Sequence, residues 1–305
     1  MKKYDFLFFG GKVLNKFGMH NIQRKVNVLA HEVVLKRIYN AISLSTIKKI
    51  TSTNNQSLDN TEKKIWICWW QGVEKAPFIV KKCIDSIVRN AGDAEVFVVT
   101  STNYKQYTNL NESITKKFYE GKIPLIHFSD IIRFNLLLNN GGIWIDASIF
   151  VTKPIPEKYF LTSFISRKDT FDNYIANVSE RKWSTYFIGG KRGLAFFELM
   201  NNMYIDYWEK NNRLLTYFLT DYFMKIAYDN NICDFKDFVD NLKFNNSKMN
   251  LLEPILNKEF SVIKWDQLLT SETLMFKLTY KREHISYSSR GKLTFYGKIF
   301  ENEEN

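Results

Sequence analysis

Three charged side chains interrupt an otherwise apolar run at residues 127–148, HFSDIIRFNLLLNNGGIWIDAS. Asp130 and Arg133 are three residues apart, which on a helix places them one turn apart on the same face. Asp146 follows the short apolar stretch IWI, and the hydroxyl of Ser148 comes two residues later. This pattern predicts a polar ligand site at a corner between a helix and a strand. The alternative is that Asp130 and Arg133 form only an ion pair on the surface of a helix.

The elements predicted around these residues would bring them to one edge of a sheet. Ser129 and Asp130 indicate the start of a helix, because a hydroxyl cap and an acid in the first turn both stabilise that end. Residues 139–142, Asn-Asn-Gly-Gly, tolerate the left-handed backbone that ends helices, and residues 143–145 predict a buried strand. Asp146 would then lie at the carboxyl end of that strand, where open α/β sheets bind their ligands.

Two segments resemble a known enzyme family. SDIIR followed by GGIWIDAS is similar to the SDxxR…GGxYxDxD signature of glycosyltransferase family 32 and of the related bacterial capsular polysaccharide synthesis transferases. The upstream segment KKIWICWWQG, residues 63–72, resembles the first strand of that family, in which a Trp faces the nucleotide base, and Trp70 falls at that position. The resemblance is strongest over residues 63–156 and implies the GT-A fold.

The family resemblance implies a hexosyltransferase. Its donor would be a nucleotide sugar, with UDP as the expected nucleotide, and its acceptor a lipid-linked oligosaccharide in the synthesis of capsular or other surface polysaccharide. By the same resemblance Asp130, Arg133 and Asp146 contact the donor, and transfer proceeds with retention of the anomeric configuration. The alternative is a non-catalytic protein that binds sugar nucleotides or glycans on a degenerate transferase fold, and Ser148 is the residue that supports it.

A divalent metal ion, Mn²⁺ or Mg²⁺, is the cofactor that this chemistry predicts. The diphosphate of the donor is anionic and gains charge as the anomeric bond breaks, and a cation with hard oxygen ligands stabilises that charge. Asp146 is the expected charged ligand. In the family resembled, a second Asp ligates the metal directly, but this sequence has Ser148 at that position. Because GT-A enzymes commonly recruit a late His as a metal or phosphate contact, the resemblance adds His284 as the third ligand.

Two further regions are predicted near the reacting groups. Asp221 lies in the apolar segment LLTYFLTDYF, where a buried carboxylate needs a partner or a function, and the capsular branch of the family has a similar D-Y-F. We expect Asp221 in the active site, near the acceptor. The loop around His284, KREHISYSSRGK, carries four Lys or Arg residues that could cover a diphosphate, among them Lys292. A basic surface loop is the alternative there.

Positive charge is concentrated at the amino terminus. Residues 1–50 contain ten Lys or Arg and two acidic residues, a net charge of +8 out of +11 for the whole chain. Apolar residues are interspersed with these charges, a composition typical of helices on an anionic membrane surface. One alternative is a helical hairpin packed on the main domain with solvated Lys side chains. Another is nucleic-acid binding, but no accompanying motif supports it, so we expect no nucleic-acid partner.

Length and patterning predict one large α/β domain, residues 61–305, after a basic helical region, residues 1–60. The 305 residues are 45% hydrophobic, which is enough for a substantial core. A polar linker is expected at residues 52–60. The order of elements favours a mostly parallel, GT-A-like sheet with covering helices. The predicted elements are strands at 65–70, 95–100, 143–145 and 260–265, and helices at 77–88, 193–211 and 214–228.

Cysteine usage and the lack of long apolar runs bear on the location of the protein. Three widely spaced cysteines without a C-x-x-C pattern argue against structural zinc and against a disulfide framework. No apolar run approaches the ~18 residues of a membrane-spanning helix, and the amino terminus has no small-residue cleavage site. We expect a cytoplasmic protein, peripheral to the inner face of the plasma membrane.

Overall fold

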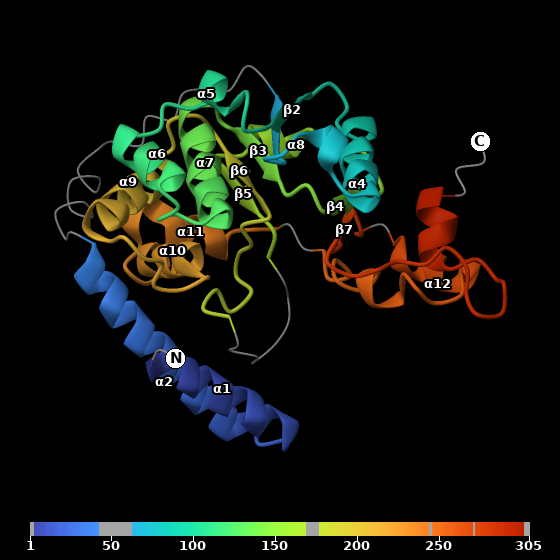
Figure 1. Cartoon of the computed structure of the whole chain (residues 1–305), viewed down its shortest axis with the longest axis horizontal. Helices are drawn as coiled ribbons and strands as arrows, with labels where there is room; N and C mark the ends of the chain where they lie inside the picture. Colours follow the sequence, from blue (N-terminus) through green and yellow to red (C-terminus); the bar gives the residue numbers. More distant parts are fainter. Residues whose placement is uncertain (1–2, 43–62, 169–176, 244–245, 271, 302–305) are drawn as a thin grey trace.

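The computed structural model describes most of the chain, namely residues 3–42, 63–168, 177–243, 246–270 and 272–301. At its centre lies a five-stranded sheet with the strand order β2-β1-β3-β6-β5 (Figure 1). The strands are β1 (Lys64–Cys68), β2 (Glu95–Val99), β3 (Gly142–Ile145), β5 (Phe164–Ser166) and β6 (Phe187–Gly190). β1 is parallel to β2 and β3, β6 is antiparallel to β3, and β5 is antiparallel to β6. Four of these five strands therefore run in one direction, which confirms the predicted mostly parallel α/β sheet.

Side chains alternate across the sheet and build an apolar layer on each face. On β1, Trp66 points into one layer, while Ile65 and Ile67 point into the other, as the period of two in a strand requires. The first layer is formed mainly by α7 (Leu125–Asn140), α9 (Ala195–Lys210) and α10 (Leu219–Asp229). The second layer is formed by α4 (Phe78–Arg89) together with the carboxyl-terminal part of the chain. The sheet is thus covered on both sides, as predicted.

α7 carries two of the predicted site residues and begins one turn earlier than expected. It starts directly after Pro124, so Ser129 lies in its second turn and does not cap it. Packing extends the helix toward its start, because Phe128 in the additional turn is fully buried. At the other end Gly141, with a φ of 65°, ends the helix as predicted. Nε1 of Trp66 donates a hydrogen bond to the carbonyl oxygen of Gly141 over 2.9 Å and ties this corner to β1.

A second, two-stranded sheet joins the carboxyl-terminal part of the chain to the main domain. β4 (Ile149–Val151) follows the corner after β3 and pairs with β7 (Met275–Lys277) in antiparallel orientation. In this pairing Ile149 stands opposite Lys277. A residue near the carboxyl terminus is thereby brought next to the end of β3.

The late strand predicted at 260–265 is wrong, because a helix, α12 (Val262–Leu268), lies there. The side chain of Ser261 accepts a hydrogen bond from the backbone N–H of Lys264 and caps that helix. The predicted linker at 52–60, and with it the boundary between 1–60 and 61–305, lies outside the described residues.

The other predicted elements are present with shifted ends. α4 follows Pro77 as expected. α10 begins at Leu219 rather than at 214, because the hydroxyl of Tyr207 holds the preceding loop through the carbonyl of Arg213 and the N–H of Leu215. The remaining α-helices are α5 (Tyr104–Tyr107), α6 (Glu112–Tyr119), α8 (Lys158–Leu161) and α11 (Phe235–Asp240). There are also the 3-10 helices η1 (Val73–Lys75), η2 (Ile232–Asp234) and η3 (Glu253–Ile255) and the π-helix η4 (Gly297–Glu301).

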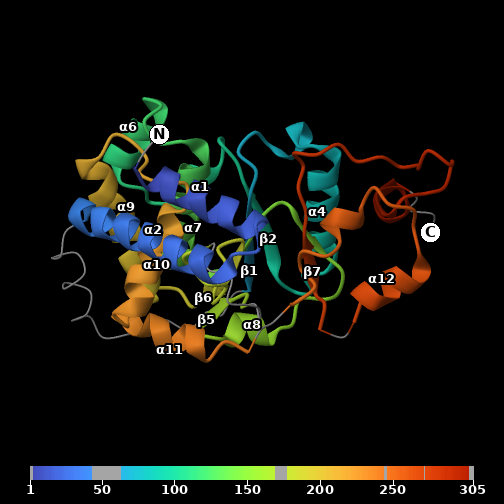
Figure 2. The same cartoon turned by 90° about the horizontal axis from the view of Figure 1, so that it is seen from below.

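α1 (Lys3–Lys16) and α2 (His20–Ala41) form a helical hairpin that extends from the main domain (Figures 1 and 2). α2 packs on α9 and α10. Ile38 is fully buried in the core layer of these helices, and Nδ1 of His31 lies 2.8 Å from the hydroxyl of Tyr222. The packed hairpin that the sequence left open as an alternative is therefore present.

We expect Ile38→Ala to lower the free energy of unfolding by about 2 to 5 kcal/mol, because it removes buried side-chain atoms beneath the hairpin. The matched control is Leu29→Ala on the same helix, where the side chain is 54% exposed, and its effect should stay below about 0.5 kcal/mol. Urea unfolding followed by circular dichroism measures both. Coincident curves for Ile38→Ala and the wild type would contradict the packing of α2 on the core.

Candidate active site

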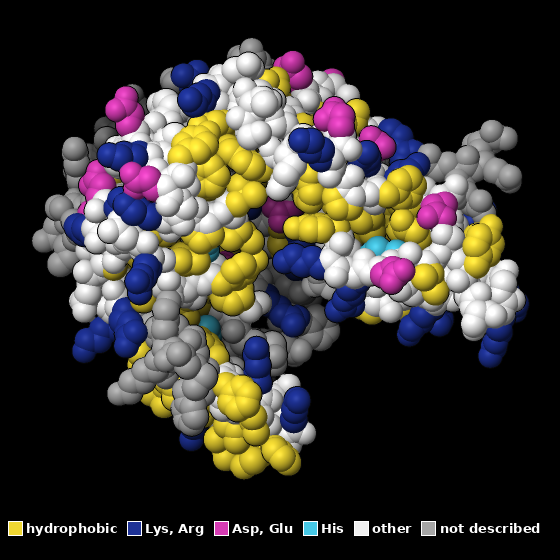
Figure 3. Space-filling view, in the orientation of Figure 1, with side chains coloured by type: hydrophobic (Ala, Val, Ile, Leu, Met, Phe, Trp, Pro, Cys, Tyr) yellow, Lys and Arg dark blue, Asp and Glu magenta, His cyan; other side chains and the backbone are white. Residues whose placement is uncertain are grey.

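A cavity of about 490 Å³ lies at the carboxyl ends of β1 and β3. Cys68 and Trp69 line it from the end of β1, Asp146 lines it from the end of β3, and α7 contributes Asp130 and Arg133. Figure 3 shows this side of the molecule hollowed, with acidic side chains inside and Lys and Arg side chains at the margin. Parallel strands end at the same edge of a sheet, so the fold brings these distant segments together.

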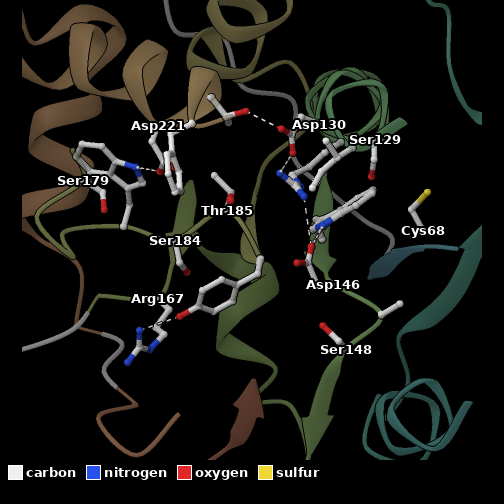
Figure 4. Close-up of a pocket in the computed structure, with 18 of the residues that line it drawn as sticks. Cys68, Ser129, Asp130, Asp146, Ser148, Arg167, Ser179, Ser184, Thr185 and Asp221 are labelled. Atoms are coloured by element: carbon white, nitrogen blue, oxygen red, sulfur yellow. Dashed lines mark hydrogen bonds and ion pairs between the residues drawn. The ribbon is translucent and has the colours of Figure 1, made fainter. Parts of the chain in front are cut away.

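Arg133 bridges two carboxylates at the base of the cavity. Its Nη1 donates to Oδ1 of Asp130 over 2.7 Å, and its Nη2 donates to Oδ1 of Asp146 over 3.3 Å (Figure 4). The guanidinium lies 4.7 Å from the ring centroid of Trp144, whose Nε1 donates to the same oxygen of Asp146 over 2.9 Å. The side chain of Arg133 is only 6% exposed, which excludes the alternative of a surface ion pair.

Lys277 adds a second cation to Asp146. Its Nζ lies 2.8 Å from Oδ2 of Asp146 and 3.0 Å from Oγ of Ser148. The pairing of β4 with β7 places it there, since Lys277 stands opposite Ile149. Lys277 is not among the residues predicted from the sequence, although a single Lys in the apolar run LMFKL is a signal for a partnered charge.

The two cations keep Asp146 ionised. Burial by itself would raise the pKa of its carboxyl group, but Lys277 and Arg133, with the hydrogen bond from Trp144, outweigh burial and lower the pKa to about 2. Asp130 and Asp146 carry two negative charges, and Arg133 and Lys277 carry two positive charges. The four groups therefore balance one another at neutral pH.

The first turn of α10 forms another wall of the cavity. Oγ1 of Thr220 donates to Oδ2 of Asp130 over 2.8 Å, so both oxygens of that carboxylate are engaged. Asp221 faces the cavity, where its Oδ1 accepts a hydrogen bond from Nε1 of Trp183 over 3.1 Å (Figure 4). Burial raises the pKa of Asp221 to about 6, although the hydrogen bond from Trp183 opposes the shift. The structure thus places Asp221 in the cavity, as its apolar context suggested.

Trp70, predicted to face a nucleotide base, does not line the cavity. Its ring packs in the helical core layer, with ring centroids 5.2 to 5.4 Å from those of Tyr104, Phe118 and Phe128. Trp69 lines the cavity instead. Beyond the end of β1 the two side chains belong to different apolar layers, Trp70 to the layer of the helices and Trp69 to the other.

Two predicted residues of the late basic loop are also absent from the cavity lining. His284 stacks on Tyr296 with ring centroids 5.1 Å apart, and its Nε2 is hydrogen-bonded to the carbonyl oxygen of Thr279 over 2.9 Å. Nζ of Lys292 lies 3.8 Å from a carboxylate oxygen of Glu259. The loop folds back on its own neighbours, which corrects the prediction that it covers the site.

The residues of the site do not fit a bound divalent metal ion. His284, the third expected ligand, lies elsewhere, and within the described part of the chain no three His, Cys, Asp or Glu side chains come together as metal ligands. The ammonium group of Lys277 lies between Asp146 and Ser148, where a metal would have to bind. One carboxylate and one hydroxyl are also few ligands for ions that take about six oxygens.

The family of the chain follows from its sequence over nearly its whole length. Residues 13–299 match the family described as capsular polysaccharide synthesis protein. The chain belongs to this family. The match includes most of the amino-terminal hairpin and confirms the resemblance to the capsular branch that the residues around Asp130 and Asp146 indicated. No curated protein matches the chain.

A solved structure, the apo form of the WbbM bifunctional glycosyltransferase, is similar to this capsular polysaccharide synthesis protein at 11% sequence identity and a TM-score of 0.41. The similarity covers 81% of this chain and 51% of the WbbM chain. The chain thus spans about half the length of that protein.

We expect Asp221→Asn to remove a pH-dependent loss of stability. The pKa of Asp221 is about 6 in the folded protein against 3.8 as the ordinary value, so the folded state binds the proton more tightly. The free energy of unfolding therefore falls as pH rises from about 4 through about 6, by on the order of 3 kcal/mol. Asn keeps an oxygen for Trp183 but cannot ionise. The variant should be more stable than the wild type at neutral pH and about equal at pH 4.

Thermal unfolding between pH 4 and pH 8 measures this difference. Asp266→Asn, at an exposed carboxylate on α12, is the matched control and should follow the wild-type curve. A constant offset between Asp221→Asn and the wild type across the whole range would show that ionisation of Asp221 does not oppose folding.

Proposed function

We propose that this capsular polysaccharide synthesis protein is a glycosyltransferase that moves a hexose from a nucleotide sugar, with UDP as the expected nucleotide, to a lipid-linked oligosaccharide. The observation that carries the proposal is the buried network of Asp130, Arg133 and Asp146 at the strand ends, in a chain of this family. Retention of the anomeric configuration, implied by the resemblance to family 32, belongs to the same proposal.

The walls of the cavity offer separate places for the parts of such a donor. Trp69 presents an aromatic ring on which a nucleobase can stack, and Tyr280 holds that ring edge-on at 5.2 Å between centroids. The remaining lone pairs of Asp130 and Asp146 can accept hydrogen bonds from sugar hydroxyls. A volume of about 490 Å³ lies within the usual range of small-molecule sites.

Asp221 supports a place for the acceptor. It lies across the cavity from Asp146 (Figure 4), so a sugar bound at Asp146 would lie between the two carboxylates. With a pKa of about 6, Asp221 is mostly ionised at neutral pH and can accept a hydrogen bond from an attacking hydroxyl. This contact would orient the acceptor oxygen toward the anomeric carbon.

Asp146→Ala should lower turnover of the preferred donor by about 100- to 1,000-fold, the usual loss when one group that stabilises the transition state is removed. The assay is hydrolysis and transfer with a panel of UDP- and GDP-sugars, with and without Mn²⁺. Asp85→Ala, at an exposed carboxylate on α4, serves as the matched control and should leave turnover unchanged. Circular dichroism of each variant checks that the fold is kept.

The same panel distinguishes the enzyme from the non-catalytic alternative. Binding of a nucleotide sugar without turnover in the presence of an acceptor extract would favour a degenerate, sugar-nucleotide-binding protein. If the protein neither binds nor turns over any donor of the panel, both functions are contradicted.

We further propose that the hairpin of α1 and α2 docks on an anionic membrane surface. One side of α2 is buried against the main domain, while the hairpin exposes large apolar side chains. These side chains are Phe9, Val13, Phe17, Met19, Ile22, Val28 and Leu29. Figure 3 shows apolar side chains gathered at the end of the hairpin with Lys and Arg side chains beside them.

Charge complementarity supports a lipid partner for this surface. Between residues 7 and 42 the hairpin carries six Lys or Arg and a single acidic residue, Glu32. Exposed apolar side chains flanked by basic ones suit an interface of anionic headgroups and acyl chains. None of the described helices has the length and apolar character needed to cross a membrane. Binding at the cytoplasmic face of the plasma membrane is part of this proposal.

The double variant Lys12→Glu with Lys16→Glu should bind vesicles of anionic lipid at least about 10-fold more weakly, because each basic residue near the surface contributes about 1 kcal/mol. Vesicle flotation at low and high salt measures binding. The control pair, Lys264→Glu with Lys298→Glu, carries the same charge change on exposed residues outside the hairpin. Docking through the hairpin would be contradicted if both double variants lost vesicle binding equally. It would also be contradicted if the wild type bound zwitterionic vesicles as well as anionic ones.

A further inference from the structure

We propose that Lys277 takes the place of the divalent cation at this site: its ammonium group binds the diphosphate of the donor, and transfer requires no metal. The inference rests on the proposed function, because it concerns how the same cavity holds a nucleotide sugar. It assigns a role to a residue that lies about 130 positions from Asp146 in the chain and next to it in space.

The position of the ammonium group carries this inference. In a D-x-D site a metal would contact the first and the third residue of the motif, and here these are Asp146 and Ser148. Nζ of Lys277 lies 2.8 Å from Oδ2 of the first and 3.0 Å from Oγ of the second. Both of these residues line the cavity. The cation therefore occupies the place between the two motif side chains.

Lys277 is held there by main-chain pairing. Its own N–H donates to the carbonyl oxygen of Met249 over 2.8 Å, and the N–H of Leu278 donates to the carbonyl oxygen of Ser148 over 2.9 Å. The side chain of Lys277 is 28% exposed, so the ammonium is neither buried in the core nor free in solvent. A cation fixed by a strand and still partly open can bind an incoming anion without a large change in the protein.

Charge supports the same conclusion. A motif with two carboxylates and a divalent cation sums to zero, and one carboxylate with one ammonium group also sums to zero. Ser148 removes one negative charge from the motif, and Lys277 supplies one positive charge. A divalent ion added beside Lys277 and Arg133 would instead place three cations around Asp146, and cations at such short distances repel each other strongly.

A second cation, Arg167, lies at the hydroxyl of Tyr186. Nζ of Lys277 lies 5.2 Å from the ring centroid of Tyr186, and the hydroxyl of that Tyr accepts a hydrogen bond from Nη1 of Arg167 over 2.8 Å. Arg167 is nearly buried and lines the cavity. Tyr186, which lines the cavity, thus lies between two positive groups, Arg167 in the lining and Lys277 next to the lining residues Asp146 and Ser148. Two spaced cations suit the two phosphates of a nucleoside diphosphate.

The bonds made and broken then follow. The bond between the anomeric carbon and the phosphate oxygen breaks, and the departing diphosphate takes the electron pair. Lys277 stays protonated and donates hydrogen bonds to the phosphate oxygens as their charge grows. The acceptor oxygen bonds to the anomeric carbon, and its proton passes to the departing phosphate.

The test measures binding of UDP, GDP and the corresponding nucleosides to the full-length protein by calorimetry, in EDTA and in Mn²⁺, together with donor hydrolysis. The wild type should bind and turn over equally in both buffers. Lys277→Met should weaken binding of the diphosphate in EDTA by about 10- to 100-fold, the effect of losing one charge-assisted hydrogen bond. Binding of the nucleoside, which has no phosphate, should not change.

Lys264→Met, at an exposed Lys on α12, is the matched control and should bind as the wild type does. If the wild type binds nucleotides and turns over donors only with Mn²⁺, the inference is wrong while the proposed function stands. If Lys277→Met binds the diphosphate as tightly as the wild type in EDTA, the inference is also wrong. If no nucleotide binds in either buffer, both the inference and the proposed function fail. The metal dependence of the wild type decides the question even if Lys277→Met does not fold.

Discussion

The bridge that Arg133 makes between Asp130 and Asp146 is the interaction on which the site depends. A guanidinium group that is 6% exposed would be costly to bury alone, and two carboxylates at hydrogen-bond distance offset that cost. Because Asp130 lies on α7 and Asp146 lies beyond β3, the bridge also fixes the helix relative to the strand end. Removing Arg133 would leave Asp130 without its guanidinium partner and would leave Lys277 as the cation paired with Asp146, so the link between the two carboxylates would be lost.

Further elements attach to this bridge through its two carboxylates. Thr220, in the first turn of α10, bonds the second oxygen of Asp130, and Lys277 on β7 bonds the second oxygen of Asp146. Helices of one apolar layer and a strand of the other therefore meet at a single charged network. The sheet makes this possible because the carboxyl ends of its parallel strands open to the same edge.

The amino-terminal hairpin has two sides with different chemistry. Ile38 and His31 belong to the interface with the main domain, whereas Phe9, Phe17 and Leu29 remain exposed beside basic residues. The two readings of the amino terminus, a packed hairpin and a surface for anionic lipid, are therefore compatible with each other.

Local pattern was sufficient for much of the fold and for half of the site. Several signals depend only on neighbours in the chain: strand periodicity, Gly141 at a positive φ, and the S-D-x-x-R and G-G-x-W-x-D spacings. From them the elements β1, β2, β3 and α4 could be predicted. The grouping of Asp130, Arg133 and Asp146 could be predicted in the same way. The start of α7 could not be predicted, because it depends on the burial of Phe128. The helix α12 could not be predicted either, because it depends on the cap at Ser261.

Only the tertiary structure decided that Trp69 rather than Trp70 lines the cavity, because Trp70 packs on Tyr104, Phe118 and Phe128 in the helical core layer. It also decided the partner of Asp146. Lys277 reaches that carboxylate because β4 and β7 pair across more than a hundred residues, and no local pattern encodes such a pairing. The sequence alone determined that a carboxylate would stand at the end of β3, since the apolar strand and the acid are adjacent in the chain. The cation beside it depends on a long-range strand register, which is a property of the folded chain.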